Sequence, residues 1–372
     1  TITFVLVLAV AYFAADKFLL TPAQQVAPTP DVNEEVIETT AAGNTIAVLP
    51  FVNMSDDEAN EYFSDGLSEE LLNVLAKNPA LQVAARTSSF SLKGEKLEIG
   101  EIGRRLNVDH VLEGSVRKSG ERVRITAQLI RADNGYHLWS DTYDRTVDDI
   151  FAVQDEIAGK IMAALIPQLV GESGEADTPP ASSDYEPPAE AYQDYLLARD
   201  RFNSRTRAGL DSAYELAQEL VRKYPDYAEA HALHAQVTMV NSARVAGEIP
   251  WIIAENQVRR SVQKASALRP DLPEIYLVEG MLHSLSRDPE TAIEFYERAN
   301  ELNPSYAEAY RRLSQAALAL GRTSESWEAL ETARKLDPIS VPTLQWVVRQ
   351  ATVHGREQMA DDAMQVLRQL AP

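Results

Sequence analysis

The stretch 136–151, YHLWSDTYDRTVDDIF, contains a histidine, a tryptophan, two tyrosines and four aspartates within sixteen residues. Carboxylates and imidazoles bind divalent metals and transfer protons, so this stretch is the first candidate for a catalytic or metal site. Such chemistry requires the side chains to converge on one point. Whether they converge depends on the secondary structure that carries them.

Hydrophobic alternation predicts three strands and a helix around this stretch. Glycine in the intervening turns favours tight reversals between the strands. Asp148 and Asp149 precede a run with helical spacing and would cap that helix, a structural role that contributes about 1 kcal/mol. The predicted strands and the helix cover the following ranges: 108–118, 122–132, 135–145 and 148–170.

One face of these strands is predicted to be apolar and the other polar. We expect Val116 to lie opposite Val123, and Arg117 opposite Arg122. Alternation through the second turn adds three residues to the core face: Leu138, Ser140 and Thr142. The polar face is then predicted to carry these side chains: Arg122, Arg124, Gln128, His137, Trp139, Asp141 and Tyr143.

The acidic side chains of this stretch are not expected to form a catalytic site. His137 and Asp141 would lie about 13 Å apart at about 3.3 Å per residue, too far to share a metal ion. The sequence contains no metalloprotease, nucleophile-elbow or phosphate-binding glycine motif, and we place Ser88 and Ser89 in a loop. We therefore predict a protein that is not an enzyme, with no catalytic residue, metal site or cofactor.

The predicted polar face has two interpretations. An acidic linker or the second half of the chain could cover it, since large aromatic side chains are seldom left bare on a sheet. Alternatively, the face binds a ligand or a partner through aromatic and arginine anchors. In that case the anchors would be Trp139, Tyr143, Arg122 and Arg124.

The composition excludes several classes of function. The chain has 372 residues and a formal net charge of −21, which repels phosphate backbones and argues against direct nucleic-acid contact. It contains no cysteine, which excludes disulfides, thiolate metal sites and a cysteine nucleophile. Hydrophobic residues make up 45% of the chain, enough for two or three domains with real cores.

Residues 1–20, TITFVLVLAVAYFAADKFLL, predict a transmembrane helix that is incomplete at its N-terminus. A spanning helix needs about 20 apolar residues, and this run is slightly short. A signal peptide is the alternative, but a basic segment and a clear cleavage site are missing. No basic residue lies between Lys17 and Lys77, so we expect the helix in a bacterial inner membrane and the bulk of the chain in the periplasm.

Two stretches rich in proline and acidic residues, 21–43 and 171–188, are typical of linkers. They bracket a predicted domain over 44–170. Short apolar runs and helical patterns in this domain predict the order β-α-β-α-β-β-β-α. This order indicates an α/β fold with a mixed sheet.

The second half, 189–372, is predicted to be an all-α tetratricopeptide-repeat solenoid of about five helix pairs. Prolines recur every 34 residues, at Pro270, Pro304, Pro338 and Pro372. This is the period of tetratricopeptide repeats, which stack into a concave binding surface. We expect a protein or peptide partner in this groove, bound by first-helix residues: Arg311, Gln315, Gln345 and Arg349.

Three segments carry a family resemblance: TIAVLPFVNMSDDEANEYFSDGLSEELLNVLAKNPALQVAARTSSFSLKG, IGRRLNVDHVLEGSVRKSGERVRITAQLIRADNGYHLWSDTYDR and DDIFAVQDEIA. They resemble the module that is similar to the amino-terminal domain of TolB and to FlgO-like flagellar proteins, which tetratricopeptide repeats often follow. The resemblance implies a single transmembrane helix before the module. Upstream it implies a winged-helix domain, as in CadC-type regulators, or a cyclase or kinase domain. It transfers no catalytic residue to this chain.

We therefore expect the periplasmic sensor or scaffold portion of a single-span signalling protein, with its cytoplasmic output domain upstream. The alternative is an accessory protein-binding subunit of an envelope complex without an output domain. The partner can also be a second copy of the chain, in a homodimer.

Overall fold

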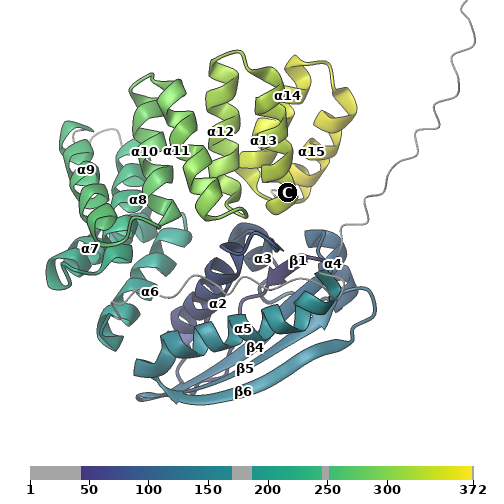
Figure 1. The fold of residues 1–372 in the computed structure, drawn as a ribbon, viewed down its shortest axis with the longest axis vertical. Coiled ribbons are helices and arrows are strands. Elements are labelled where there is room, and N and C mark those ends of the chain that lie inside the picture. Colours follow the sequence, from purple (N-terminus) through teal and green to yellow (C-terminus); the bar gives the residue numbers. More distant parts are fainter. Residues whose placement is uncertain (1–42, 170–186, 245–250, 371–372) are drawn as a thin grey trace, which may run out of the picture. The chain divides into compact units, whose positions relative to one another are not determined.

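A computed structural model describes residues 43–169, 187–244 and 251–370 of the chain (Figure 1). The predicted transmembrane helix, the first linker up to residue 42 and most of the second linker lie outside these ranges. Within them, no helix is both long and apolar enough to cross a membrane. The described residues form one compact unit.

The N-terminal part is built on a mixed sheet with the strand order β3-β1-β4-β5-β6, and β2 pairs with β4. β1 runs parallel to β3 and β4, whereas β4, β5 and β6 are antiparallel. The strands have these bounds: β1 (Thr45–Val48), β2 (Val52–Asn53), β3 (Gln82–Val83), β4 (His110–Ser119), β5 (Arg122–Arg131) and β6 (His137–Thr146). β1 is buried along its whole length, as its nearly all-apolar sequence predicts.

Two long helices, α2 and α5, pack on one face of this sheet (Figure 1). On α2, Leu67, Leu71 and Leu75 recur every four residues and are at most 1% exposed, so they form one apolar stripe. A smaller cluster with α4 packs on the other face, near the start of β4. The helices of this part have these bounds: η1 (Glu58–Asn60), α2 (Glu61–Ala76), α3 (Arg86–Ser91), α4 (Ile99–Leu106), η2 (Val147–Asp149) and α5 (Ile150–Leu169).

The hairpin of β4 and β5 has a different register from the predicted one. Val116 lies opposite Ile125, and Arg117 lies opposite Arg124. The hairpin closes at Ser119 and Arg122, so its loop is the two-residue segment 120–121. A shift of two residues keeps every side chain on its predicted face, because side chains alternate along a strand.

A β-bulge in β6 reverses the predicted faces of that strand. Ile130 pairs with His137, but Leu129 pairs with Trp139, so Leu138 is an extra residue in the ladder. One extra residue moves every following side chain to the opposite face. The prediction of the polar face is therefore wrong for the residues of β6 that follow the bulge.

Tyr143 and Trp139 lie on the core face as a result. Tyr143 lies opposite Ile125 and is 3% exposed, and Trp139 packs partly buried against the core. Asp141 moves to the same face. The polar face instead receives these residues of β6: Ser140, Thr142, Asp144 and Thr146.

The described residues after the second linker form ten helices in five consecutive pairs (Figure 1). The helices have these bounds: α6 (Ala189–Asn203), α7 (Arg207–Lys223), α8 (Ala228–Arg244), α9 (Trp251–Leu268), α10 (Pro273–Leu285), α11 (Pro289–Leu302), α12 (Ala307–Ala319), α13 (Thr323–Leu336), α14 (Val341–Val353) and α15 (Glu357–Leu370). Small residues let paired helices approach: a Cβ on Gly280 of α10 would lie 2.4 Å from the ring of Tyr296 on α11.

One hydrophobic core extends from the sheet into the first helix pairs. It joins Phe63 of α2 to Tyr192 of α6, and their rings meet edge to face with centroids 6.5 Å apart. A Cβ on Gly66 of α2 would lie 2.7 Å from the side chain of Leu196, so α2 and α6 are in close contact there. The predicted boundary between the two halves therefore does not separate two independent cores.

Candidate interaction surfaces

Beyond the part that α4 covers, the side of β4, β5 and β6 that faces away from α2 and α5 is polar, and we call this part the open face. Toward the β4–β5 turn it carries three exposed arginines, Arg117, Arg122 and Arg124. Asp144 accepts a hydrogen bond from Nη2 of Arg122 and another from Nη2 of Arg124, each 2.6 Å long. These two arginine hydrogen bonds lower the pKa of Asp144 to about 2, so its carboxylate is ionised at neutral pH.

Among the described residues, no carboxylate pairs with Arg117 in this way. Its Nε donates to the carbonyl oxygen of Met54 at 3.0 Å. Arg117 and Arg124 lie directly opposite each other on neighbouring strands, an arrangement of like charges that destabilises a sheet. The open face therefore keeps positive charge that the carboxylate of Asp144 does not balance.

The outer edge of β6 is protected by its own side chains. A carboxylate oxygen of Asp141 accepts a hydrogen bond from the backbone N–H of Thr142 at 2.8 Å. The side chain of Arg145 donates to the carbonyl of Asp144 at 3.2 Å. Capping of this kind discourages an added strand. Asp141 thus has a structural role, and the bulge places it on the opposite face of the sheet from His137.

The four predicted groove residues differ in accessibility. Arg311 is 7% exposed and donates from Nε to Glu308 at 2.9 Å. Gln315 is half-buried, whereas Gln345 and Arg349 of α14 are exposed. Of the four, Gln345 and Arg349 are therefore accessible to a partner.

A junction that the sequence did not indicate joins the outer edge of β3 and the residues after it to the α11–α12 loop and the end of α13. The backbone N–H of Val83 donates to Oγ of Ser305 at 3.0 Å. The N–H of Ala85 donates to the carbonyl of Leu336 at 2.7 Å. These bonds occupy donors at the edge of the sheet, which would otherwise be open to another strand.

Ser88 completes this junction, and its predicted position in a loop is wrong. Ser88 and Ser89 are fully buried on α3. Oγ of Ser88 donates to the carboxylate of Asp337 at 2.6 Å and accepts from the N–H of Ile339 at 3.3 Å. Burial raises the pKa of Asp337 to about 6, although the hydrogen bond from Ser88 lowers it.

A buried ion cluster adds a second contact between the sheet domain and the repeats. Nε of Arg199 on α6 donates to Glu69 of α2 at 2.8 Å, and its guanidinium also pairs with Glu70. Glu69 accepts further hydrogen bonds from Arg86 at 2.7 Å and Asn203 at 2.8 Å. Burial raises the pKa of Glu69, but the guanidiniums of Arg199 and Arg86 lower it overall. The removal of either guanidinium would leave a poorly compensated buried charge.

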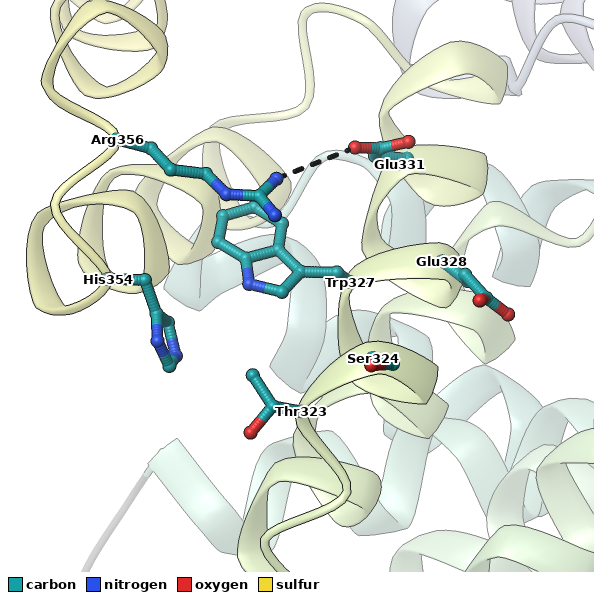
Figure 2. Close-up of a pocket in the computed structure, with 7 residues that line it drawn as sticks. All are labelled: Thr323, Ser324, Trp327, Glu328, Glu331, His354 and Arg356. Atoms are coloured by element: carbon teal, nitrogen blue, oxygen red, sulfur yellow. Dashed lines mark ion pairs between the residues drawn. The ribbon is translucent and has the colours of Figure 1, made fainter. Parts of the chain in front are cut away.

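The repeats also contain an open pocket of about 500 Å³, beside α13 and the turn between α14 and α15 (Figure 2). The guanidinium of Arg356 lies 4.2 Å from the ring centroid of Trp327 and 3.9 Å from Glu331. These contacts pack the last helix pair against the preceding one. The pocket is lined by these residues: Thr323, Ser324, Trp327, Glu328, Glu331, His354 and Arg356.

The buried histidines of α8 have structural partners. Nδ1 of His234 lies 2.8 Å from Oγ of Ser261, and burial lowers the pKa of His234 to about 4. Nε2 of His231 lies 2.9 Å from the carbonyl of Pro225. Within the described ranges, no three His, Asp or Glu side chains are grouped so that they could hold a metal ion.

The polar junction was missed because its partners are far apart in the chain. Ser88 and Asp337 are separated by 249 residues, and Arg199 and Glu69 by 130. The repeat register offers one signal, since Asp337 occupies the position of Asn303 in the preceding repeat, directly before the repeat proline. This register locates the loop but does not identify what it contacts.

Two family models match the chain. Residues 42–160 match the second domain of HilA/YgeH-like transcriptional regulators, and residues 285–340 match a tetratricopeptide repeat. The chain therefore contains a HilA/YgeH-like regulator module followed by tetratricopeptide repeats. This confirms the predicted order of an α/β module followed by tetratricopeptide repeats.

One curated relative is a putative adenylate cyclase 3 of Rhizobium meliloti (strain 1021). It is 39% identical over 213 residues, which cover 57% of this chain and 35% of the relative. The chain thus spans about a third of the length of the relative that it matches.

Three solved structures are similar at low sequence identity. PilW, a type IV pilus biogenesis factor, is 14% identical, with a TM-score of 0.38 over 48% of this chain and 77% of PilW. A thermophilic tetratricopeptide protein of Thermus thermophilus is 17% identical, with a TM-score of 0.37 over 55% and 94% of the two chains. MamA from Desulfovibrio magneticus RS-1 is 16% identical, with a TM-score of 0.33 over 48% and 92%.

Proposed function

We propose that the chain is the sensor or scaffold portion of a single-span bacterial membrane signalling protein, with its described residues in the periplasm. The two kinds of match support this role. The family model belongs to transcriptional regulators, and the relative is named an adenylate cyclase. We infer from these names that modules of this type occur in proteins with different output domains. A winged-helix or cyclase domain upstream would supply the output in this protein.

The observation that carries the proposal is the continuous packing between the repeats and the sheet domain. α6 shares a core with α2, and the carboxylate of Asp337 accepts a hydrogen bond from the hydroxyl of Ser88 on α3. A partner that stabilises one arrangement of the repeats would therefore also bias the sheet domain. This coupling suits a protein that converts partner binding into a signal.

The proposed binding residues are Gln345 and Arg349 on α14. The guanidinium of Arg349 lies 5.2 Å from the ring centroid of Trp346, a cation–π contact that orients it. Arg349 is exposed and can pair with a carboxylate of the partner. Gln345, one helical turn earlier, offers both a donor and an acceptor.

A cysteine reporter tests the membrane topology, because this chain contains no cysteine of its own. We would introduce Ser119→Cys at the exposed β4–β5 turn of the full-length protein and treat spheroplasts with a membrane-impermeant maleimide. Labelling of intact spheroplasts is expected, and the unsubstituted protein is the control. Labelling that requires lysis would contradict the periplasmic placement.

Partner binding is tested by affinity capture from membranes with the double variant Gln345→Ala/Arg349→Ala. The proposal expects a stoichiometric partner with the wild-type chain and its loss with this variant. A matched control is Arg334→Ala/Lys335→Ala, which changes two exposed side chains of α13. Arg311 is unsuitable for this purpose because it is itself buried, and its substitution would perturb its ion pair with the half-buried Glu308. A partner retained by the groove variant would reject the groove as its site.

A further inference from the structure

We infer that the open face of the sheet is a second binding surface, which takes an acidic peptide segment of a partner protein with an apolar side chain beside its carboxylates. This surface is separate from the proposed groove on α14 and does not depend on it. The inference rests on the charge, the apolar neighbours and the protected edge of the sheet.

Toward the β4–β5 turn, the open face is positively charged, opposite in sign to the chain as a whole. The whole chain carries −21, yet three arginines gather within two neighbouring strands on this face. Arg122 and Arg124 are 72% and 58% exposed at their side chains, and they share the carboxylate of Asp144. An anionic ligand would relieve the repulsion between Arg117 and Arg124.

Asp144 indicates how a ligand carboxylate would bind. Its two oxygens each accept one hydrogen bond from a different guanidinium, so they bridge Arg122 and Arg124 at 2.6 Å. Arg117 stands on the other side of Arg124, one strand further from Asp144. A carboxylate from a partner could bridge Arg117 and Arg124 in the same way.

Apolar side chains border the arginines on β2 and directly after it. Val52 is 59% exposed and lies opposite Ser115 of β4, so it shares the face of Arg117. Met54, two residues further on, is 48% exposed, and its carbonyl accepts the hydrogen bond from Arg117. A row across the strands therefore presents a methionine, two arginines and a carboxylate. Neighbouring strands are about 4.8 Å apart, so a short peptide segment can span this row.

Because the edge of β6 is protected, a partner would bind to the open face and not as an added strand. The N–H of Thr142 is bound by Asp141, and the N–H of Thr146 lies 3.4 Å from the carboxylate of Asp149. At the opposite edge, β3 is bonded to Ser305 of the repeats. Strand addition is thus hindered at both edges, whereas the side chains of the open face remain accessible.

The test measures binding of a fluorescein-labelled peptide of repeating Glu-Val-Gly units by fluorescence anisotropy. The full chain should bind this peptide, with an affinity that falls as salt is added. The variant Arg117→Ala/Arg124→Ala should raise the dissociation constant at least about tenfold. Circular dichroism checks folding, and the single variant Arg117→Ala, at an exposed side chain, replaces the double variant if that variant unfolds.

Matched controls show whether a loss of binding is specific to the arginines of the open face. Arg334→Ala/Lys335→Ala removes the same charge from α13 and should leave binding unchanged, and a peptide with Gln for Glu should not bind. The inference is overturned if the arginine variant binds like wild type, if the control variant loses binding equally, or if no peptide binds. Binding to phosphatidylglycerol vesicles without peptide binding would indicate a lipid surface instead. Peptide binding lost only in Gln345→Ala/Arg349→Ala would reject the open face while supporting the proposed groove.

Discussion

At the residue scale, Asp337 links the repeats to the sheet domain and is also titratable. It is 6% exposed, it accepts hydrogen bonds from Ser88 and Ser340, and the carboxylate of Glu308 repels it. Burial, the largest of these effects, raises its pKa to about 6, whereas an aspartate in an unfolded chain titrates near pH 4. The folded chain therefore holds this proton more tightly than the unfolded chain.

This difference predicts that stability depends on pH through Asp337. The favourable contribution of proton binding is fully present below about pH 4 and is lost as the pH rises through about 6. We expect Asp337→Asn, which cannot ionise, to be more stable than wild type at pH 7 by about 2–3 kcal/mol, with the difference vanishing near pH 4. Urea unfolding across this range measures it. Parallel pH profiles for the two proteins would contradict the prediction.

Asp141 is the second residue whose role the structure changes. Its carboxylate caps the backbone N–H of Thr142 at the exposed edge of the sheet. We expect Asp141→Ala to alter the free energy of unfolding by less than about 0.5 kcal/mol, because the site is exposed. The freed N–H should, however, promote self-association through strand pairing. Sedimentation velocity at increasing concentration measures this. Asp148→Ala, with the same loss of charge, should stay unassociated, and equal association of both variants would count against edge protection.

At the element scale, single backbone positions decide how strands and helices meet. The bulge at Leu138 brings Tyr143 onto the core face, where burial raises its pKa to about 12. Between helices, Gly280 allows the ring of Tyr296 to lie against the backbone of α10. Both cases depend on contacts between elements. The hydrophobic pattern within one element does not predict such contacts.

Two glycine-to-alanine substitutions separate packing from helix propensity. Gly280→Ala should destabilise the chain by about 1–3 kcal/mol, because the new Cβ would lie 2.4 Å from a ring carbon of Tyr296. Gly159→Ala on α5 meets no atom of the described residues beyond its own helix backbone within 4 Å and should be neutral or stabilising by up to about 1 kcal/mol. Thermal unfolding of both variants provides the comparison. Similar effects at the two sites would exclude close packing as the cause.

At the scale of the whole molecule, the sheet domain and the first repeats share one core. Tyr192 of α6 lies between two rings, with centroids 6.5 Å from Phe63 and 4.7 Å from Phe151. Its hydroxyl oxygen lies 2.6 Å from the side-chain nitrogen of Gln154 on α5. A repeat helix thereby completes the core of the α/β domain, so the two parts should unfold together.

We therefore expect Tyr192→Ala to cost about 3–5 kcal/mol and to reduce amide protection in α5 and β4 as well as in α6. Hydrogen exchange measured by mass spectrometry checks this. Trp327→Ala serves as the comparison, because α13 lies late in the repeats and meets the sheet domain next to α3, where the carbonyl of Leu336 accepts from Ala85. Its effect should be confined to α13–α15 and α3. Unchanged protection in α5 and β4 of the Tyr192 variant would contradict a shared core.

The candidate surfaces were partly predictable from the sequence. The three arginines of the open face were placed correctly, because the β4–β5 register shifted by two residues and preserved the alternation. Trp139 and Tyr143 were assigned to the wrong face, because the pattern of apolar and polar residues does not indicate a bulge. Ser88 was assigned to a loop, because its buried partner Asp337 lies 249 residues away.

The sequence by itself determined the features that depend on local patterns: the mixed α/β module, the 34-residue repeat, the acidic charge and the absence of cysteine. These features follow from the composition of the chain and from the spacing of residues that lie close together in the sequence. Only the tertiary structure decided the face of β6, the shared core at Tyr192 and the junction of Ser88 with Asp337. Each of these depends on which distant residues come together, and packing of the whole chain sets that choice.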